Sequence, residues 1–302
     1  MSELPGSIPG VLDVQRLRGA AAAPGTPPTL AIEIPHGATQ TLDFMALAAQ
    51  LTSPLPDGLA DFFHVNTDAG APELGQAVAE RFVAARPEAV AVVLRCRVPR
   101  TFIDCNRRMD ASPEDFKAGK VTPGLMPWIV TPEDRALLRG RYETYVSAVR
   151  AVAEATLPGG FLLLLHTYAP REVGVEVDAD IVKSLRWAYT PEVEPTWPLR
   201  PEVDVIGRDL DGVVHSPTAV LEALRVGLAG VGVAMADGAT YPLHPSTLAH
   251  GHVLRWPGRA LCVEVRRDLV AAPWSPFTEM TIGADKVARL AGPLTQAILA
   301  VV

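Results

Sequence analysis

Two histidines and a carboxylate stand where they could hold a catalytic metal ion. His36 and His166 each follow a short apolar run, and the third ligand is Asp68 or, less favourably, Glu73. Two imidazoles and a carboxylate are a common catalytic zinc set that leaves one coordination position for water. A single histidine is more often a hydrogen-bonded core or turn residue, and the chain has no HExxH or CxxC pair. The set predicts one Zn²⁺ per chain, although other divalent ions suit the same donors.

Glu264 interrupts an apolar run at residues 261–265. Burying a carboxylate without a partner is costly, so this residue needs an explanation. If Glu264 faces the metal, it could accept a proton from water and return it to a leaving amine. If it points outward, it would pair with Arg266 or Arg267, and the residues alone do not decide between the two. His64 is either a partner of the metal ligands or an exposed residue.

Polar residues after another apolar run could bind the carboxylate of a substrate. Asn106, Arg107 and Arg108 close the stretch 102–108. A guanidinium is always charged and binds a carboxylate through two parallel hydrogen bonds. We expect Arg107 to bind it, assisted by Arg108 or Asn106, although an Arg-Arg pair is more commonly solvated and Asn106 could instead fix the turn. Tyr241 follows a further expected strand and is another candidate for substrate binding.

The elements that must position these residues alternate along the chain. Short apolar runs predict strands, and residues spaced by three or four predict helices. Alternating strands and helices indicate an α/β fold with a mainly parallel mixed sheet flanked by helices on both faces. In such sheets ligands bind at the carboxyl ends of the strands, where the polar residues above fall. The expected strands are 30–34, 89–94, 161–165, 230–235 and 260–265, and the expected helices are 73–85, 132–155, 217–229 and 285–299, with a short one near 179–187.

The chain length of 302 residues fits either one large α/β domain or two ordinary ones. Residues 18–28 are rich in Ala, Pro and Gly, so we expect residues 1–28 to be an N-terminal extension and residues 29–302 to form a single α/β domain. Residues 171–212 contain many prolines and acids with little periodicity. A loop this long is usually functional or poorly ordered, which predicts an inserted lid or, equally, a surface excursion.

Composition excludes several classes of partner. The net charge is −7, and the basic residues are scattered, which argues against nucleic acid. A membrane span of about 20 apolar residues is missing, and so is the pattern of a secretory signal. Three cysteines without CxxC spacing are typical of reduced thiols. We therefore expect a cytoplasmic protein that acts on a small molecule, and the sequence does not predict its oligomeric state.

With these residues assembled, the chain resembles the N-formylglutamate amidohydrolase family. The similarity extends from about residue 30 to 290, and its most specific motif is Phe-Ile-Asp-Cys-Asn-Arg at 102–107. The other motifs are Ile-Pro-His-Gly at 34–37, His64 with Asp-Ala-Gly-Ala at 68–71, Leu-His-Thr-Tyr-Ala-Pro at 165–170 and Val-Glu-Val-Arg-Arg-Asp-Leu at 263–269.

The resemblance implies a zinc-dependent amidohydrolase with a three-layer fold like that of the zinc carboxypeptidases. By analogy His36, Asp68 and His166 would bind zinc and Glu264 would be the general base and acid. Arg107, with Asn106, would grip the substrate carboxylate.

The chain also departs from the family pattern. Gly37 stands where the family has Ser, Thr67 stands where an aromatic residue is common, and the Asn-Glu-Pro-Tyr run is changed at 236–242. These changes concern the substrate more than the metal chemistry. We therefore expect hydrolysis of the amide bond of a small N-acyl or N-formyl amino acid rather than of N-formylglutamate specifically. The alternatives are a binding or regulatory protein that has lost catalysis, and a zinc exopeptidase for short peptides.

Overall fold

A seven-stranded mixed sheet runs through the part of the chain that the computed structural model describes, residues 4–119, 121–157 and 159–302. The strand order is β1-β3-β2-β4-β7-β5-β6. The strands are β1 (Leu12–Arg18), β2 (Leu30–Ile34), β3 (Val90–Cys96), β4 (Phe161–Tyr168), β5 (Val203–Val205), β6 (Met235–Asp237) and β7 (Ala260–Arg266).

Four central strands of the sheet, β3, β2, β4 and β7, run parallel to one another. The edge strand β1 is antiparallel to β3, and β5 is antiparallel to β7. β6 pairs in parallel with β5 and so also runs against the central strands. The carboxyl ends of the four parallel strands therefore share one rim of the sheet, as ligand sites of open α/β sheets require.

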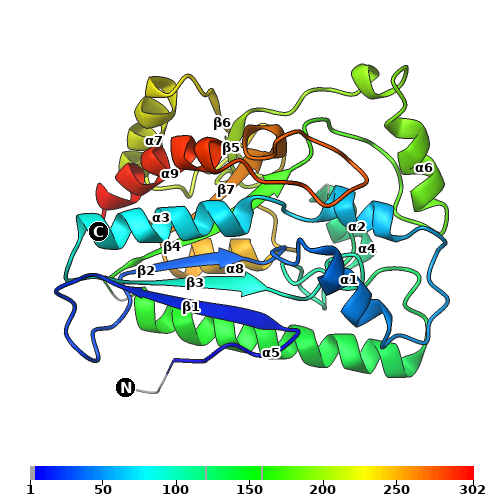
Figure 1. Ribbon diagram of the computed structural model, residues 1–302, viewed down its shortest axis with the longest axis horizontal. Coiled ribbons are helices and arrows are strands. Elements are labelled where there is room, and N and C mark those ends of the chain that lie inside the picture. Colours follow the sequence, from blue (N-terminus) through cyan, green and yellow to red (C-terminus); the bar gives the residue numbers. More distant parts are fainter. Residues whose placement is uncertain (1–3, 120, 158) are drawn as a thin grey trace.

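Helices cover both faces of this sheet and complete a three-layer α/β structure, as predicted (Figure 1). On one face the core is formed with α3 (Ala71–Ala85), α7 (Thr218–Gly230) and α9 (Ala284–Leu299). On the other face it is formed mainly with α5 (Pro132–Thr156) and α8 (Leu248–Arg255). The remaining helices are α1 (Thr41–Ala48), α2 (Ala60–Asn66), α4 (Pro113–Ala118) and α6 (Ile181–Ala188).

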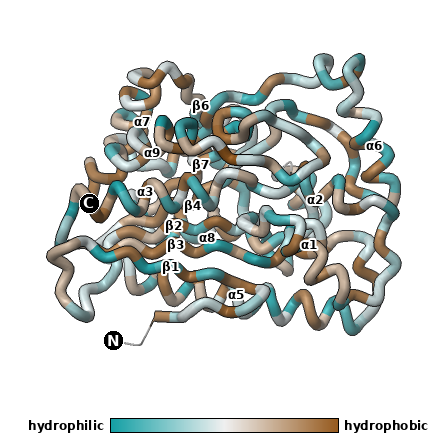
Figure 2. Tube along the Cα trace, in the orientation of Figure 1, coloured by the Kyte–Doolittle hydropathy of each residue, from teal (hydrophilic) through white to brown (hydrophobic). Residues whose placement is uncertain are grey.

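The central strands form because their residues are apolar on both faces. β2 and β4 are buried along their whole length, which is the pattern of a strand covered by helices on each side. Figure 2 shows the hydrophobic residues along these central strands. The packing of α3 against them is close: a Cβ on Gly75 would lie 2.9 Å from Cδ1 of Ile34.

The predicted N-terminal extension and the predicted insertion at 171–212 each contribute a strand to the sheet that the sequence did not predict. Within residues 1–28, β1 pairs with β3 along its whole length, from Leu12 opposite Cys96 to Arg18 opposite Val90. Within residues 171–212, β5 pairs with β7. Both strands were missed because β1 lies at an edge with one polar face, and β5 has only three residues.

The strand expected at 230–235 is also displaced. Residues up to Gly230 belong to α7, and β6 begins only at Met235. Gly232 adopts a positive φ of 66°, which ends the helix in a turn before the strand starts. None of the helices in the described part of the chain is long and apolar enough to cross a membrane.

Candidate metal centre

Three side chains meet at the shared rim of the parallel strands. His36 Nδ1 lies 3.2 Å from Asp68 Oδ2, His166 Nδ1 lies 3.0 Å from the same oxygen, and the two Nδ1 atoms are 3.3 Å apart. All three residues are buried. The structure thus brings together the predicted ligand set, and this group could hold a metal ion.

Each ligand comes from a different element that packing fixes in place. His36 follows the end of β2, and His166 lies within β4 beside it. Asp68 occupies the turn between α2 and α3, where its backbone N–H donates to the carbonyl of His36. Gly70 closes that turn with a φ of 90°, and a Cβ there would lie 2.4 Å from Cγ2 of Val270. Only glycine fits this turn, because both its conformation and its space exclude a side chain.

The spacing of the three donor atoms fits a divalent metal ion. Ligands about 2.0–2.1 Å from a tetrahedral zinc are about 3.3 Å from one another, close to the distances of 3.0–3.3 Å observed. Two imidazole nitrogens that face each other at 3.3 Å also need a shared cation or proton, since two lone pairs repel. The spacing of the buried donors therefore fits Zn²⁺ or a similar ion.

Asp104 fixes the orientation and tautomer of His36. Its Oδ1 lies 2.8 Å from His36 Nε2, so the Nε2–H donates to the carboxylate and Nδ1 keeps its lone pair for a metal. Burial raises the pKa of Asp104, but Arg107, His36 and Arg100 together hold it well below its usual range. The sequence motif contains Asp104 but does not predict its role; the signal available is its place after a buried strand, among apolar neighbours.

Asp68 is surrounded by positive and hydrogen-bonding groups. Burial raises the pKa of Asp68, but the charges and hydrogen bonds of the His36 and His166 imidazoles lower it by more. The pKa of Asp68 therefore lies below its ordinary value. Its second oxygen, Oδ1, lies 3.9 Å from Arg100 Nη1 and 4.0 Å from Arg267 Nη2. Asp68 is therefore ionised, with one oxygen directed to the histidines and the other to two arginines.

Glu264 lies beside this group on the neighbouring strand. It pairs in register with His166 across β4 and β7, and with Asp204 across β7 and β5. Its Oε2 is buried and has no hydrogen-bond partner among the described residues. Burial raises the pKa of Glu264 to about 7, although the charges of His166, Arg200 and Arg100 oppose the rise. A carboxylate with this pKa is suited to accept and release a proton near neutral pH.

Arg107 is buried and makes contacts different from those of a free clamp. Its Nη2 lies 3.2 Å from Asp104 Oδ2, Nε donates to the carbonyl of Thr122 at 3.1 Å, and Nη1 donates to the carbonyl of Asn106 at 3.2 Å. All three nitrogens of Arg107 thus have a protein partner. The arrangement makes Arg107 a support for Asp104.

Asn106 and Arg108 point elsewhere. Asn106 Oδ1 accepts the backbone N–H of Ala249, which anchors the beginning of α8, so this side chain fixes local structure. Arg108 makes two hydrogen bonds to Asp110, at 3.0 and 2.6 Å, and half of its side chain is exposed. The structure therefore places Arg108 in a surface ion pair and not in the site.

Tyr241 contacts Arg200, although β6, the strand before it, runs against the central strands. Its hydroxyl accepts a hydrogen bond of 2.8 Å from Nη2 of Arg200, a residue of the 171–212 segment. Burial raises the pKa of Tyr241, which keeps the hydroxyl protonated. Sequence reasoning missed Arg200, because a single arginine in a proline-rich stretch carries no periodic or motif signal.

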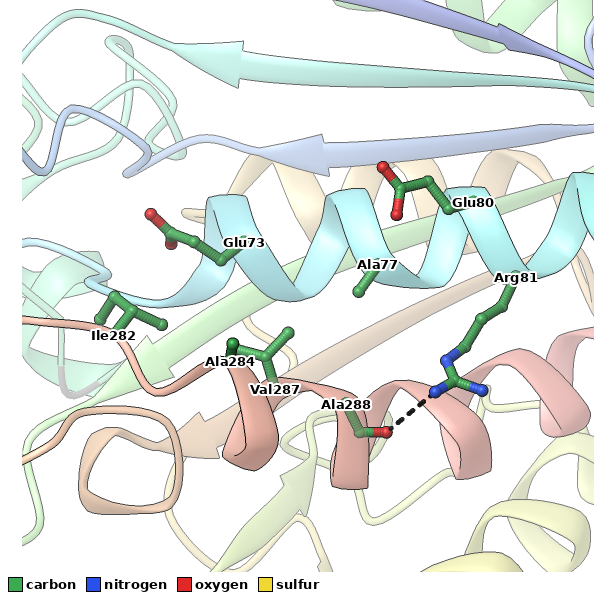
Figure 3. A pocket seen from close by; sticks show the side chains of 8 residues that line it. All are labelled: Glu73, Ala77, Glu80, Arg81, Ile282, Ala284, Val287 and Ala288. Atoms are coloured by element: carbon green, nitrogen blue, oxygen red, sulfur yellow. Dashed lines mark hydrogen bonds between the residues drawn. The ribbon is translucent and has the colours of Figure 1, made fainter.

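Two alternative candidates lie away from the metal ligands. Glu73 is exposed on α3 and lines a surface cavity of about 380 Å³ with Ile282, which precedes α9, and Ala284, the first residue of α9 (Figure 3). Asp68, and not Glu73, is therefore the carboxylate of the ligand group. His64 is buried in α2, where burial lowers its pKa, and among the described residues no hydrogen bond joins it to the ligands.

Two of the departures from the family pattern have local causes. A Cβ on Gly37 would lie 2.7 Å from Cγ of Arg95, whose Nε donates to the Gly37 carbonyl, so serine does not fit. The hydroxyl of Thr67 donates to the carbonyl of Ala38 at 2.6 Å. This bond ties the loop after His36 to the turn that carries Asp68.

Sequence comparisons find no counterpart, whereas structural comparisons do. No family model matches the chain, and no curated protein is detectably similar to it in sequence. N-formylglutamate amidohydrolase from Ralstonia eutropha JMP134 aligns over 96% of this chain and 96% of its own, with a TM-score of 0.59 and 16% identity. A gene product from Agrobacterium tumefaciens aligns over 96% and 94%, with a TM-score of 0.51 and 19% identity.

A metallo-carboxypeptidase from Burkholderia cenocepacia is more distant, with a TM-score of 0.36 and 13% identity over 95% of this chain and 59% of its own. The full-length alignment with the Ralstonia eutropha protein confirms the predicted resemblance at the level of the fold. The chain has the fold of N-formylglutamate amidohydrolase, with a buried His-Asp-His group at the ends of its parallel strands that could bind a metal ion.

Proposed function

We propose that this protein is a metal-dependent amidohydrolase that cleaves the amide bond of a small N-acyl amino acid, with N-formyl amino acids as the first candidates. The observation that carries the proposal is the juxtaposition of the ligand group with Glu264. His36, Asp68 and His166 present three donor atoms within 4.8 Å of one another. Glu264 pairs with His166 on the adjacent strand and has a buried oxygen with no hydrogen-bond partner among the described residues.

The ligand residues and the base divide the chemistry between them. When bound by His36, Asp68 and His166, a divalent ion would supply a Lewis acid that polarises the acyl oxygen and lowers the pKa of a water molecule. Glu264 accepts the proton of that water as the water oxygen bonds to the acyl carbon. The same carboxyl then delivers the proton to the amine nitrogen as the C–N bond breaks, so the products are a carboxylic acid and an amino acid.

The remaining charged residues keep this group in its working state. Asp104 holds His36 in the tautomer that leaves Nδ1 unprotonated, and Arg107 and Arg100 hold Asp104 ionised. In the metal-free protein burial raises the pKa of Glu264 to about 7, which suits a group that acts first as a base and then as an acid. Basic side chains lie close to the site, and their positive charge attracts a substrate that carries a carboxylate.

The test combines metal analysis with a substrate panel. The purified chain should contain about one zinc or similar ion per molecule, and it should hydrolyse N-formyl or N-acetyl amino acids. His166→Ala should lose both the metal and the activity, whereas Arg108→Ala, at a surface ion pair, should keep both. Stoichiometric metal without hydrolysis of any N-acyl amino acid would contradict the proposed activity.

The two alternative functions give different results in the same assays. A chain with no bound metal would fit the binding or regulatory protein. Faster cleavage of dipeptides than of N-formyl amino acids would fit the exopeptidase. The structure offers no observation that favours either over the proposed amidohydrolase.

A further inference from the structure

We infer that Arg200, and not Arg107, binds the carboxylate of the substrate. This inference rests on the proposed function and names the residue that would recognise the substrate. The first observation concerns the positive charge of the Arg200 side chain. Among the described residues, Arg200 has no carboxylate within ion-pair distance, whereas Arg107, Arg100 and Arg266 are each paired with an aspartate.

The backbone around Arg200 is held rigidly beside the site. The Arg200 N–H donates to the carbonyl of Pro170 at 2.9 Å, and its carbonyl accepts a hydrogen bond from Arg266 Nη1 at 2.9 Å. The hydroxyl of Tyr168 donates to the next carbonyl, that of Pro201, at 2.7 Å. Arg266 and Tyr168 belong to β7 and β4, the strands that carry Glu264 and His166. These bonds fix Arg200 relative to the proposed base and metal ligands.

The guanidinium is oriented by two aromatic rings. Its central carbon lies 5.2 Å from the ring centroid of Tyr168 and 5.6 Å from that of Tyr241, within the range of cation–π contacts. Nη1 donates to the carbonyl of Ala169 at 3.2 Å, and Nη2 donates to the hydroxyl of Tyr241 at 2.8 Å. A guanidinium held between rings loses little further freedom when it binds a carboxylate.

The Nε of Arg200 is buried and has no hydrogen-bond partner among the described residues. A buried N–H without an acceptor is costly, and a carboxylate oxygen from a ligand would remove that cost. Nε and the adjacent Nη2 form the edge of a guanidinium that binds a carboxylate through two parallel bonds. Arg107 offers no such edge, since its Nε and Nη1 donate to backbone carbonyls and its Nη2 is paired with Asp104.

The 171–212 segment also helps to position Tyr241 beside Arg200. Asp204, four residues after Arg200, is fully buried and accepts hydrogen bonds from the backbone N–H groups of Ala239 and Thr240. Those bonds place Tyr241, which in turn contacts Arg200. Asp204 also lies opposite Glu264 in the pairing of β5 with β7. Arg200, Tyr241 and Glu264 are thus held together through one short strand.

The experiment measures binding preference by isothermal titration calorimetry. The probes are N-formyl-L-alanine and N-formyl-L-alaninamide, which differ only in the carboxylate, and the protein is the zinc-loaded full chain with Glu264→Gln to prevent turnover. With Arg200 present, the carboxylate should bind about 10- to 100-fold more tightly than the carboxamide, the value of a charge-assisted hydrogen bond. Arg200→Met should reduce this preference to within about threefold.

Arg186→Met is the matched control. Arg186 lies in the same segment but forms an exposed ion pair with Asp61, so the preference should persist. Arg200→Lys keeps the charge without the planar edge and should give an intermediate preference for the carboxylate. If the methionine variant does not fold, the preference of Arg200→Lys tests the inference about Arg200 in its place. An unchanged preference in the Arg200 variants, or none in the protein with Arg200, would overturn the inference.

A separate rate measurement distinguishes this failure from failure of the proposed function. The chain with native Glu264 is assayed for hydrolysis of N-formyl-L-alanine. Hydrolysis with a preference that does not depend on Arg200 contradicts only the inference about Arg200. A preference that depends on Arg200, without hydrolysis of any N-acyl amino acid, contradicts only the proposed activity.

Discussion

Replacing Asp104 by asparagine should weaken metal binding at the His36–Asp68–His166 group. The Asp104 carboxylate accepts the Nε2–H of His36 at 2.8 Å and leaves Nδ1 as the metal donor. The amide of asparagine could instead donate to Nε2, which would place the imidazole proton on Nδ1, where a metal ligand needs a lone pair. The variant tests whether this one contact sets the tautomer.

The size of the effect follows from the contacts of Asp104. Losing such a partner of a metal ligand typically reduces affinity about 10- to 100-fold, which is about 1.4–2.7 kcal/mol. Asp104 Oδ2 also lies 2.9 Å from Arg100 Nη2 and 3.2 Å from Arg107 Nη2. Removing a buried charge from its partners costs about 3–5 kcal/mol, so the metal-free variant should also be less stable.

A chelator competition assay measures the zinc affinity, and thermal denaturation of the metal-free protein measures the stability. Asp110→Asn is the control, because that carboxylate is exposed and its pair with Arg108 is screened by solvent. If Asp104→Asn and Asp110→Asn bound zinc equally well, Asp104 would not orient His36. If only stability changed, the residue would be structural alone.

Further substitutions test the base and the fit of the loop after β2. Glu264→Gln should lower hydrolysis of N-acyl amino acids about 100- to 10,000-fold at unchanged metal content, and retained turnover would exclude Glu264 as the base. In the metal-free protein, burial raises the pKa of Glu264 from its ordinary 4.5 to about 7, so the folded state binds its proton more tightly than the unfolded state does. Its contribution to the free energy of unfolding should therefore fall by up to about 3 kcal/mol as pH rises through this window. Urea titrations measure the free energy of unfolding of the wild type and of Glu264→Gln at each pH, and parallel pH profiles for the two proteins would contradict this. Gly37→Ser should destabilise the fold by about 1–3 kcal/mol, because its Cβ would lie 2.7 Å from Cγ of Arg95. Gly140→Ser is the control, because a Cβ there meets open space and should not destabilise the fold. Equal shifts in melting temperature for the two variants would refute the packing argument.

The sequence predicts the central strands and the ligand group because both depend on strong local signals. β2 begins and ends where the apolar run 30–34 predicts, since both of its faces are buried. His36, Asp68 and His166 could be grouped because polar residues at the ends of parallel strands must share one rim. The antiparallel direction of β5 and β6 was not predictable, because their short strands carry no signal of direction.

The contacts of the arginines could not be read from the sequence. Arg107 and Arg200 have the same side chain, and only the fold decides which one meets Asp104 and which one keeps a buried Nε without a hydrogen-bond partner among the described residues. Asp104 was likewise visible as a residue but not as the partner of His36, because the two are far apart in the chain and meet only through the pairing of β2 with β3. Such pairings depend on tertiary packing, which periodicity does not report.

The place of β7 in the sheet has a consequence for biosynthesis. β5 and β6 are joined to the rest of the sheet through β7, which is translated more than fifty residues after β5. During translation the segment with Arg200 and Asp204 therefore emerges before the strand against which it pairs. The three candidate ligands lie within the first 166 residues, whereas Glu264 and the strand that pairs with β5 arrive only with β7. A nascent chain arrested before residue 260 would thus contain all three ligands but lack the base, and also Arg267 and Val270, which lie against the turn that carries Asp68.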